Sequence, residues 1–198
     1  MRGRRTRIWL AGAGLLVVAV GVALALLVPR GASRPAALSG TAIDGSPAAP
    51  DFTLVDQDGR RVRLSALRGK LVLVTFLYVH CPDVCPLIAS RLNAALPLLG
   101  PRARVVAVSV DPRGDTPAAV RAYVRARGLG PHFRYVLGSQ AQLAPVWKAY
   151  FLGVTPTPGA VMHSSMTVLV DAEGRERVRY DASATPAQIA HDARVLRL

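Results

Sequence analysis

Residues 76–86 have the sequence FLYVHCPDVCP and contain both cysteines of the chain. Cys81 and Cys85 lie four residues apart, and a proline follows each of them. The run before them, Leu71–Tyr78, is almost entirely apolar, β-branched or aromatic, which predicts a strand buried on both faces. The run after them, Pro86–Leu99, has apolar residues at helical spacing and begins with a proline, which suits a first helical turn. The thiols are therefore predicted at a strand-to-helix turn, where they could carry out redox chemistry or bind a soft metal ion.

The rest of the chain alternates between strand-like and helix-like segments. A β-hairpin is predicted first, with strands at 52–55 and 61–64 around an Asp-Gly turn. The elements predicted after the cysteine region are a strand at 104–110, a helix at 117–127, a short strand at 133–137, a helix at 140–151, a loop at 153–161, paired strands at 166–170 and 175–180, and a last helix from 185. This order predicts an α/β domain with a mixed β-sheet flanked by helices, as in the thioredoxin-like fold.

Residues 1–29 differ from the rest in composition and predict an N-terminal transmembrane helix. Ile8–Val28 is a run of 21 residues without a charge, and at about 1.5 Å per residue it spans roughly 31 Å, enough to cross a bilayer. Four arginines precede it, which by the positive-inside rule places the N-terminus in the cytoplasm. We expect a single-pass anchor in the cell membrane with the C-terminal domain on the periplasmic side. The alternative is a cleaved signal peptide.

Residues 30–50 are rich in Ala, Gly, Ser and Pro, which is typical of a flexible linker. Residues 51–198 remain for one folded domain, which is long enough to bury a core without disulfide bonds. The formal net charge is +13, but six of the basic residues precede residue 35, where no acid occurs. The other basic residues are scattered and form no basic helix or groove, so we expect no nucleic-acid partner.

The position of the two thiols favours a chemical role. Unpaired N–H groups at the start of a helix favour an anion, so at least one thiolate is expected near neutral pH. At positions i and i+4 the two sulfurs can converge to chelate a metal or close a disulfide. A purely structural disulfide would close a very short loop and stabilise the fold little, and two buried cysteines without a role are the remaining alternative.

Among the four histidines, His163 is the strongest candidate for a third ligand. It precedes the predicted strand at 166–170, and in a thioredoxin-like sheet that loop lies beside the cysteine loop. His80 directly precedes the first cysteine, but a lone histidine there is more often a hydrogen-bonding residue, and His132 and His191 are expected in solvent. Two thiolates and one imidazole form a soft, low-coordinate ligand set, which suits Cu(I) and can hold Cu(II) with one more ligand.

The motif YVHCPDVCP at residues 78–86 resembles the signature of the Sco/SenC copper chaperones. Further segments extend the resemblance over most of residues 51–197, namely DQDG at 56–59, LRGK at 67–70, SVDP at 109–112, DTP at 115–117, HS at 163–164 and VD at 170–171. The resemblance implies that Cys81, Cys85 and His163 are copper ligands, for Cu(I), Cu(II) or both.

The same resemblance implies a membrane-tethered protein with its domain outside the cytoplasm. Members of the family deliver copper to the binuclear copper site of cytochrome c oxidase subunit II, or reduce the cysteines of that site, and other copper carriers are further candidate partners. The chain departs from the family pattern at Met162, where an acidic residue usually precedes the histidine. Loss of that carboxylate would favour Cu(I). Met162 and Met166 add thioethers beside His163, although methionines next to a strand are more often core residues.

Two enzymatic functions are alternatives. A thiol–disulfide oxidoreductase using Cys81 and Cys85 is the stronger one, but such enzymes usually have Cys-x-x-Cys and a proline before the later strand, where this chain has Ser165. A peroxidase would need a threonine three residues before Cys85, where this chain has Pro82. We therefore expect a metallochaperone rather than an enzyme, with disulfide reduction as the alternative activity.

Overall fold

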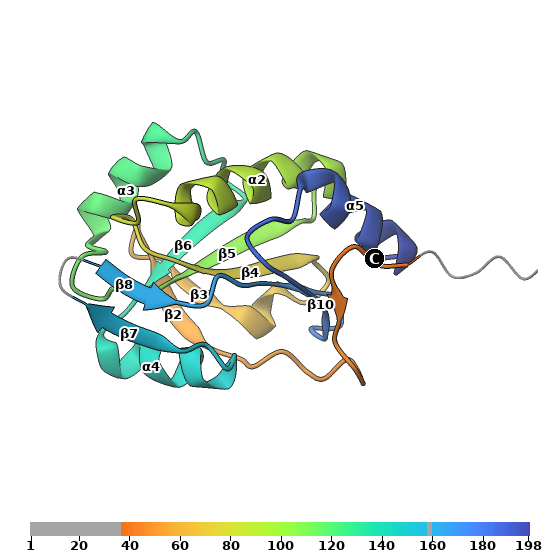
Figure 1. Cartoon of the computed structure of the whole chain (residues 1–198), viewed down its shortest axis with the longest axis horizontal. Coiled ribbons are helices and arrows are strands. Elements are labelled where there is room, and N and C mark those ends of the chain that lie inside the picture. Colours follow the sequence, from red (N-terminus) through yellow and green to blue (C-terminus); the bar gives the residue numbers. More distant parts are fainter. Residues whose placement is uncertain (1–36, 158–159) are drawn as a thin grey trace, which may run out of the picture. The chain divides into compact units, whose positions relative to one another are not determined.

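The computed structural model describes residues 37–157 and 160–198 (Figure 1). The predicted membrane segment, Ile8–Val28, lies outside these residues. Within them, no helix has both the length and the apolar character that crossing a membrane requires.

One large β-sheet forms the centre of this domain. Its strands are β1 (Thr41–Ala42), β2 (Thr53–Asp56), β3 (Arg61–Arg63), β4 (Val72–Leu77), β5 (Arg104–Ser109), β6 (Phe133–Leu137), β9 (Thr167–Val170) and β10 (Glu176–Tyr180). The eight strands lie in the order β1-β10-β9-β4-β5-β6-β2-β3. The three central strands β4, β5 and β6 are parallel, and β9 and β2 flank them in antiparallel orientation. The prediction of a mixed sheet is confirmed.

In the described residues, four α-helices cover the two faces of the sheet (Figure 1). They are α2 (Val84–Leu99), α3 (Pro117–Ala126), α4 (Gln140–Ala149) and α5 (Pro186–Val195), and a short 3-10 helix, η1 (Leu64–Leu67), follows β3. Helices α2, α3 and α5 lie on one face, with α2 packed against α5, and α4 lies on the other. All four helices were predicted, including α4 with Pro145 inside it.

Strand β4 occupies the middle of the core because both of its faces are covered. All six of its residues are buried, as its unbroken apolar sequence predicts. It pairs with β5 in parallel register from Val72–Arg104 to Leu77–Ser109, so both strands end at the same edge of the sheet. The cysteine turn and the loop before α3 are consequently neighbours at that edge.

Two local predictions are wrong. Residues 153–161, predicted as a loop, contribute to an antiparallel ribbon of β7 (Val154–Thr157) and β8 (Ala160–His163). Within the described part of the chain, these two strands pair with each other and not with the large sheet. The flexible linker predicted over residues 30–50 is packed from residue 39 onward. Ser39 and Gly40 donate backbone hydrogen bonds to the buried carboxylate of Asp192, and β1 pairs with β10. Small residues suit this path, because a side chain on Gly40 would collide with β10.

The position of β4 in the core predicts a large effect of shortening Phe76. Its ring is 0% exposed and meets the ring of Tyr150 edge to face at 5.3 Å. Phe76→Ala should lower the free energy of unfolding by about 3–5 kcal/mol, measured by urea denaturation. Phe151→Ala is the matched control, because this ring is 86% exposed, and it should change stability by no more than about 0.5 kcal/mol. Similar losses in both variants would contradict this core assignment.

Candidate metal centre

The two cysteines lie where β4 gives way to α2. Cys81 is in the turn after β4, and Cys85 is in the first turn of α2, which begins two residues earlier than predicted. The backbone N–H of Cys85 donates to Cys81 Sγ at 3.4 Å. Both thiols are free and buried, with 8% of Cys81 and 0% of Cys85 exposed. One sulfur therefore accepts a hydrogen bond at the start of the helix, and the other is enclosed by the core.

His163 brings an imidazole to the thiols from a distant part of the sequence. It is the last residue of β8, and its Nε2 lies 4.0 Å from Cys85 Sγ. Its Nδ1 lies 3.1 Å from the carbonyl oxygen of Ser164, which can only accept, so the proton is assigned to Nδ1. The lone pair of Nε2 is then available toward Cys85 Sγ. The ring of Tyr78 meets the imidazole edge to face at 5.9 Å.

The two thiols have opposite acidities. Burial alone would raise the pKa of Cys81, but hydrogen bonds from the Cys85 thiol and from the backbone N–H groups of Asp83 and Cys85 hold it below its usual value. Burial, together with the interaction with Cys81, raises the pKa of Cys85 well above its usual value. In the metal-free protein, the first thiolate therefore forms at Cys81, as expected at a helix N-terminus.

Burial also lowers the pKa of His163, although the hydrogen bond with Ser164 opposes this effect. The imidazole is therefore neutral at neutral pH, and its lone pair is available. A thiolate, a second thiol that can lose its proton to a bound metal, and a neutral imidazole form a set of donors that soft metal ions prefer.

The sequence profile of the SCO1/SenC family matches residues 40–196. The chain belongs to the SCO1/SenC family. Protein SenC of Rhodobacter capsulatus is 33% identical over 191 residues, which cover 91% of this chain and 86% of that protein. The solved structure of ScoI from Bradyrhizobium japonicum with copper bound is 32% identical, with a TM-score of 0.64 over 76% of this chain and 98% of that one.

A second solved relative is BsSco, described as a member of the Sco family of cytochrome c oxidase assembly proteins in which a disulfide switch was identified. It is 25% identical, with a TM-score of 0.66 over 78% of this chain and 96% of that one. The predicted membership of the Sco/SenC family is thus confirmed, and these neighbours share the mixed sheet flanked by helices.

The two methionines beside His163 have different environments. Met166 is 7% exposed and belongs to the core, as expected for a methionine next to a strand. Met162 is 66% exposed and does not. It occupies the position at which a carboxylate was expected, so this SCO1/SenC chain has a solvent-facing thioether there.

Asp115 is a residue of the site region whose role the sequence did not indicate. Thr116 caps α3 by accepting from the N–H of Ala119. Asp115 instead accepts from the N–H of Val79 at 2.8 Å and so fastens the segment before the cysteines to the loop after β5. Ser109 Oγ and Tyr135 OH donate to its other oxygen. Burial raises the pKa of Asp115 to about 6.

The acidity of the two thiols predicts different reactivities. In the reduced, metal-free protein, iodoacetamide should alkylate Cys81 faster than Cys85 at pH 7. The Cys85→Ala substitution should move the midpoint of the pH dependence of Cys81 alkylation to higher pH, because the S–H group that donates to Cys81 is lost. Mass spectrometry of samples quenched at pH 5 to 10 measures both effects. Faster alkylation of Cys85 than of Cys81 would contradict the assignment of the thiolate.

The raised pKa of Asp115 predicts a pH-dependent stability. Its folded-state pKa of about 6 exceeds the value of about 3.9 in unfolded chains. The resulting stabilisation is fully present below about pH 4, is lost as the pH rises through 6, and amounts to at most about 3 kcal/mol. Asp115→Asn cannot titrate, so the stability of the wild type minus that of the variant should fall between pH 4 and 7.5. A difference that does not change with pH in urea denaturation would refute this.

Proposed function

We propose that this chain is a membrane-anchored, extracytoplasmic copper carrier that serves the assembly of cytochrome c oxidase. Cys81, Cys85 and His163 are its copper ligands, and the binuclear copper site of oxidase subunit II is the destination. The observation that carries this proposal is the approach of His163 Nε2 to within 4.0 Å of Cys85 Sγ, at the end of the turn that holds Cys81.

The donor set fits copper better than zinc. Sulfur and imidazole nitrogen are soft to borderline donors, and three of them suit Cu(I). A structural zinc site would be expected to have four protein ligands, whereas the proposed set has three, namely Cys81, Cys85 and His163. Copper is bound in the structure of the Bradyrhizobium relative, which supports the same cargo here.

The membrane anchor is proposed from composition alone. Residues 1–29, with the uncharged run Ile8–Val28, would hold the domain at the outer face of the cell membrane. Such tethering would keep the copper carrier beside a membrane-embedded oxidase. The description of BsSco as a member of a family of cytochrome c oxidase assembly proteins supports an oxidase as the recipient.

Reduction of a disulfide in the recipient, with Cys81 and Cys85 becoming oxidised to a disulfide, is a second function with specific support. Cys81 has a lowered pKa and lies beside a second thiol, which is the arrangement needed to attack a disulfide and then resolve the mixed disulfide. The two functions are compatible, because a recipient with oxidised cysteines cannot bind copper until they are reduced.

Copper binding by the purified chain tests the ligand assignment. The protein should bind about one Cu(I) per chain, measured by competition with a chromophoric chelator. Cys81→Ser, Cys85→Ser and His163→Ala should each weaken binding at least tenfold, because each removes one of three donors. His132→Ala is the matched control, since it removes an imidazole at the start of β6. Unchanged affinity in all three ligand variants would end the proposal.

Delivery is tested by mixing the loaded protein with the copper-free soluble domain of subunit II. The absorption of the binuclear site should appear with reduced recipient, and the three ligand variants should not produce it. With oxidised recipient and metal-free protein, the appearance of recipient thiols would instead support the reductase function. Failure of both reactions would leave a copper-binding protein without the proposed recipient.

A further inference from the structure

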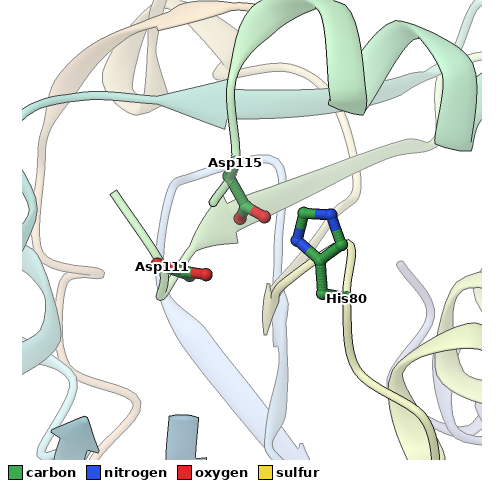
Figure 2. A group of neighbouring side chains, drawn as sticks. All are labelled: His80, Asp111 and Asp115. Atoms are coloured by element: carbon green, nitrogen blue, oxygen red, sulfur yellow. The ribbon is translucent and has the colours of Figure 1, made fainter. Parts of the chain in front are cut away.

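A second group of metal-ligating side chains lies on the loops beside the cysteines. It consists of His80, Asp111 and Asp115, and one donor atom of each lies within 4.8 Å of the other two. Figure 2 shows that the imidazole ring and the two carboxylates face a common space. His80 projects into it from the turn after β4, and the two aspartates project into it from the loop after β5. His80 is exposed, Asp111 is half-buried and Asp115 is 4% exposed, so the group connects the surface with the interior.

Each of these side chains has a lone pair that no hydrogen bond in the described residues uses, so it could bind a metal ion. The Oδ2 of Asp115 accepts two hydrogen bonds, but its Oδ1 accepts only one, from Val79, and keeps a lone pair. The Oδ1 of Asp111 accepts from the N–H groups of Arg113 and Gly114, and its Oδ2 accepts from no residue of the described chain. No side chain or backbone group in residues 37–157 and 160–198 forms a hydrogen bond with His80, although a bonded histidine was expected there.

Gly114 keeps the space between the donors open. A Cβ atom there would collide with Asp111 Oδ2 and would come within 3.1 Å of His80 Nδ1. The backbone of Gly114 is not in the left-handed region, so its conformation alone does not demand a glycine. A glycine at position 114 is instead explained by the space that the carboxylate of Asp111 and the imidazole of His80 occupy.

Electrostatics also favours a cation at this position. Neither Asp111 nor Asp115 forms an ion pair with a lysine or arginine of the described residues. Burial is the main cause of the raised pKa of Asp115, and its hydrogen bonds oppose that effect. The negative charge of the neighbouring Asp111 raises this pKa further, because the two carboxylates repel each other. A cleft of about 870 Å³, lined by His80, Asp111 and Gly114 among others, gives an ion access to the imidazole of His80 and the carboxylate of Asp111.

We propose that His80, Asp111 and Asp115 form a second metal site, which takes a divalent first-row transition-metal ion such as Zn²⁺. One imidazole and two carboxylates are the nitrogen and oxygen donors that such ions accept, in contrast to the sulfur-rich set of Cys81, Cys85 and His163. Bonds of about 2.0–2.2 Å require the donors to draw closer than they lie here, and the exposed ring of His80 is the one most free to move. The proposal does not depend on copper binding at the cysteines.

Zn²⁺ binding to the full-length chain tests this site. A background variant with Cys81→Ser, Cys85→Ser and His163→Ala lacks all three proposed copper ligands, so its titration reports other sites. Isothermal titration calorimetry of the detergent-solubilised protein should give about one Zn²⁺ per chain. His80→Ala and Asp111→Asn should each weaken binding at least tenfold, and Asp111→Asn keeps an oxygen that can accept from Gly114. Co²⁺ as a probe should give a visible spectrum that the same substitutions abolish.

Three further variants separate a metal site from general effects. Gly114→Ala should weaken Zn²⁺ binding by displacing the Asp111 carboxylate, with thermal unfolding confirming that the domain remains folded. His132→Ala and Asp83→Asn remove an imidazole and an exposed carboxylate elsewhere and should leave binding unchanged. No binding at micromolar Zn²⁺, or binding that survives both His80→Ala and Asp111→Asn, would overturn the proposal.

Discussion

The parallel pairing of β4 with β5 is the constraint on which the rest of the structure depends. Because the pairing runs in register along both strands, their carboxyl ends reach the same edge of the sheet together. The loops that follow must then share that edge, and the buried carboxylate of Asp115 joins them through the N–H of Val79. The cysteines, the imidazole of His80 and the two aspartates are neighbours because of this one pairing.

Burial and hydrogen bonding have opposite effects on the pKa values of the two thiols at this edge. Burial keeps Cys85 protonated, whereas the hydrogen-bond donors at the start of α2 overcome it at Cys81. The result is an asymmetric pair in which one sulfur is ready to react or bind and the other loses its proton only to a metal or a partner. A single short motif thereby combines two donors of the proposed metal site with a thiolate suited to disulfide chemistry, which is why the two proposed functions are difficult to separate from the sequence.

Much of the fold could be predicted because its signals are local. The apolar run of β4, the helical spacing in α2 and the Asp-Gly hairpin each report their own structure, and Pro145 did not prevent α4 from forming. The β7–β8 ribbon was missed because Pro156 and Pro158 suggest a loop, although an isolated two-stranded ribbon tolerates proline better than a central strand does. The packing of residues 39–50 was missed because it depends on Asp192, far away in the sequence.

The three residues of the candidate site could also be singled out from the sequence, and their role as ligands stays a prediction. Cys81 and Cys85 are conspicuous as the only cysteines, and the position of His163 followed from the resemblance and from the expected order of strands. The grouping of His80 with Asp111 and Asp115 could not be predicted, because the pattern of one strand does not reveal the side chains on the next loop. The spacing of Asp111 and Asp115 around Gly114 was the only available signal, and a turn before a helix explains it equally well.

The β7–β8 ribbon places the imidazole of His163 on a different part of the structure from the two sulfurs. Both sulfurs belong to segments that are part of the core, so any change there affects folding and chemistry together. The imidazole of His163 belongs to β8, which in the described residues pairs with β7 and lies outside the large sheet. Position 163, which we propose as the third ligand, is therefore modular: an engineer could exchange its residue while the core segments that hold both sulfurs stay unchanged.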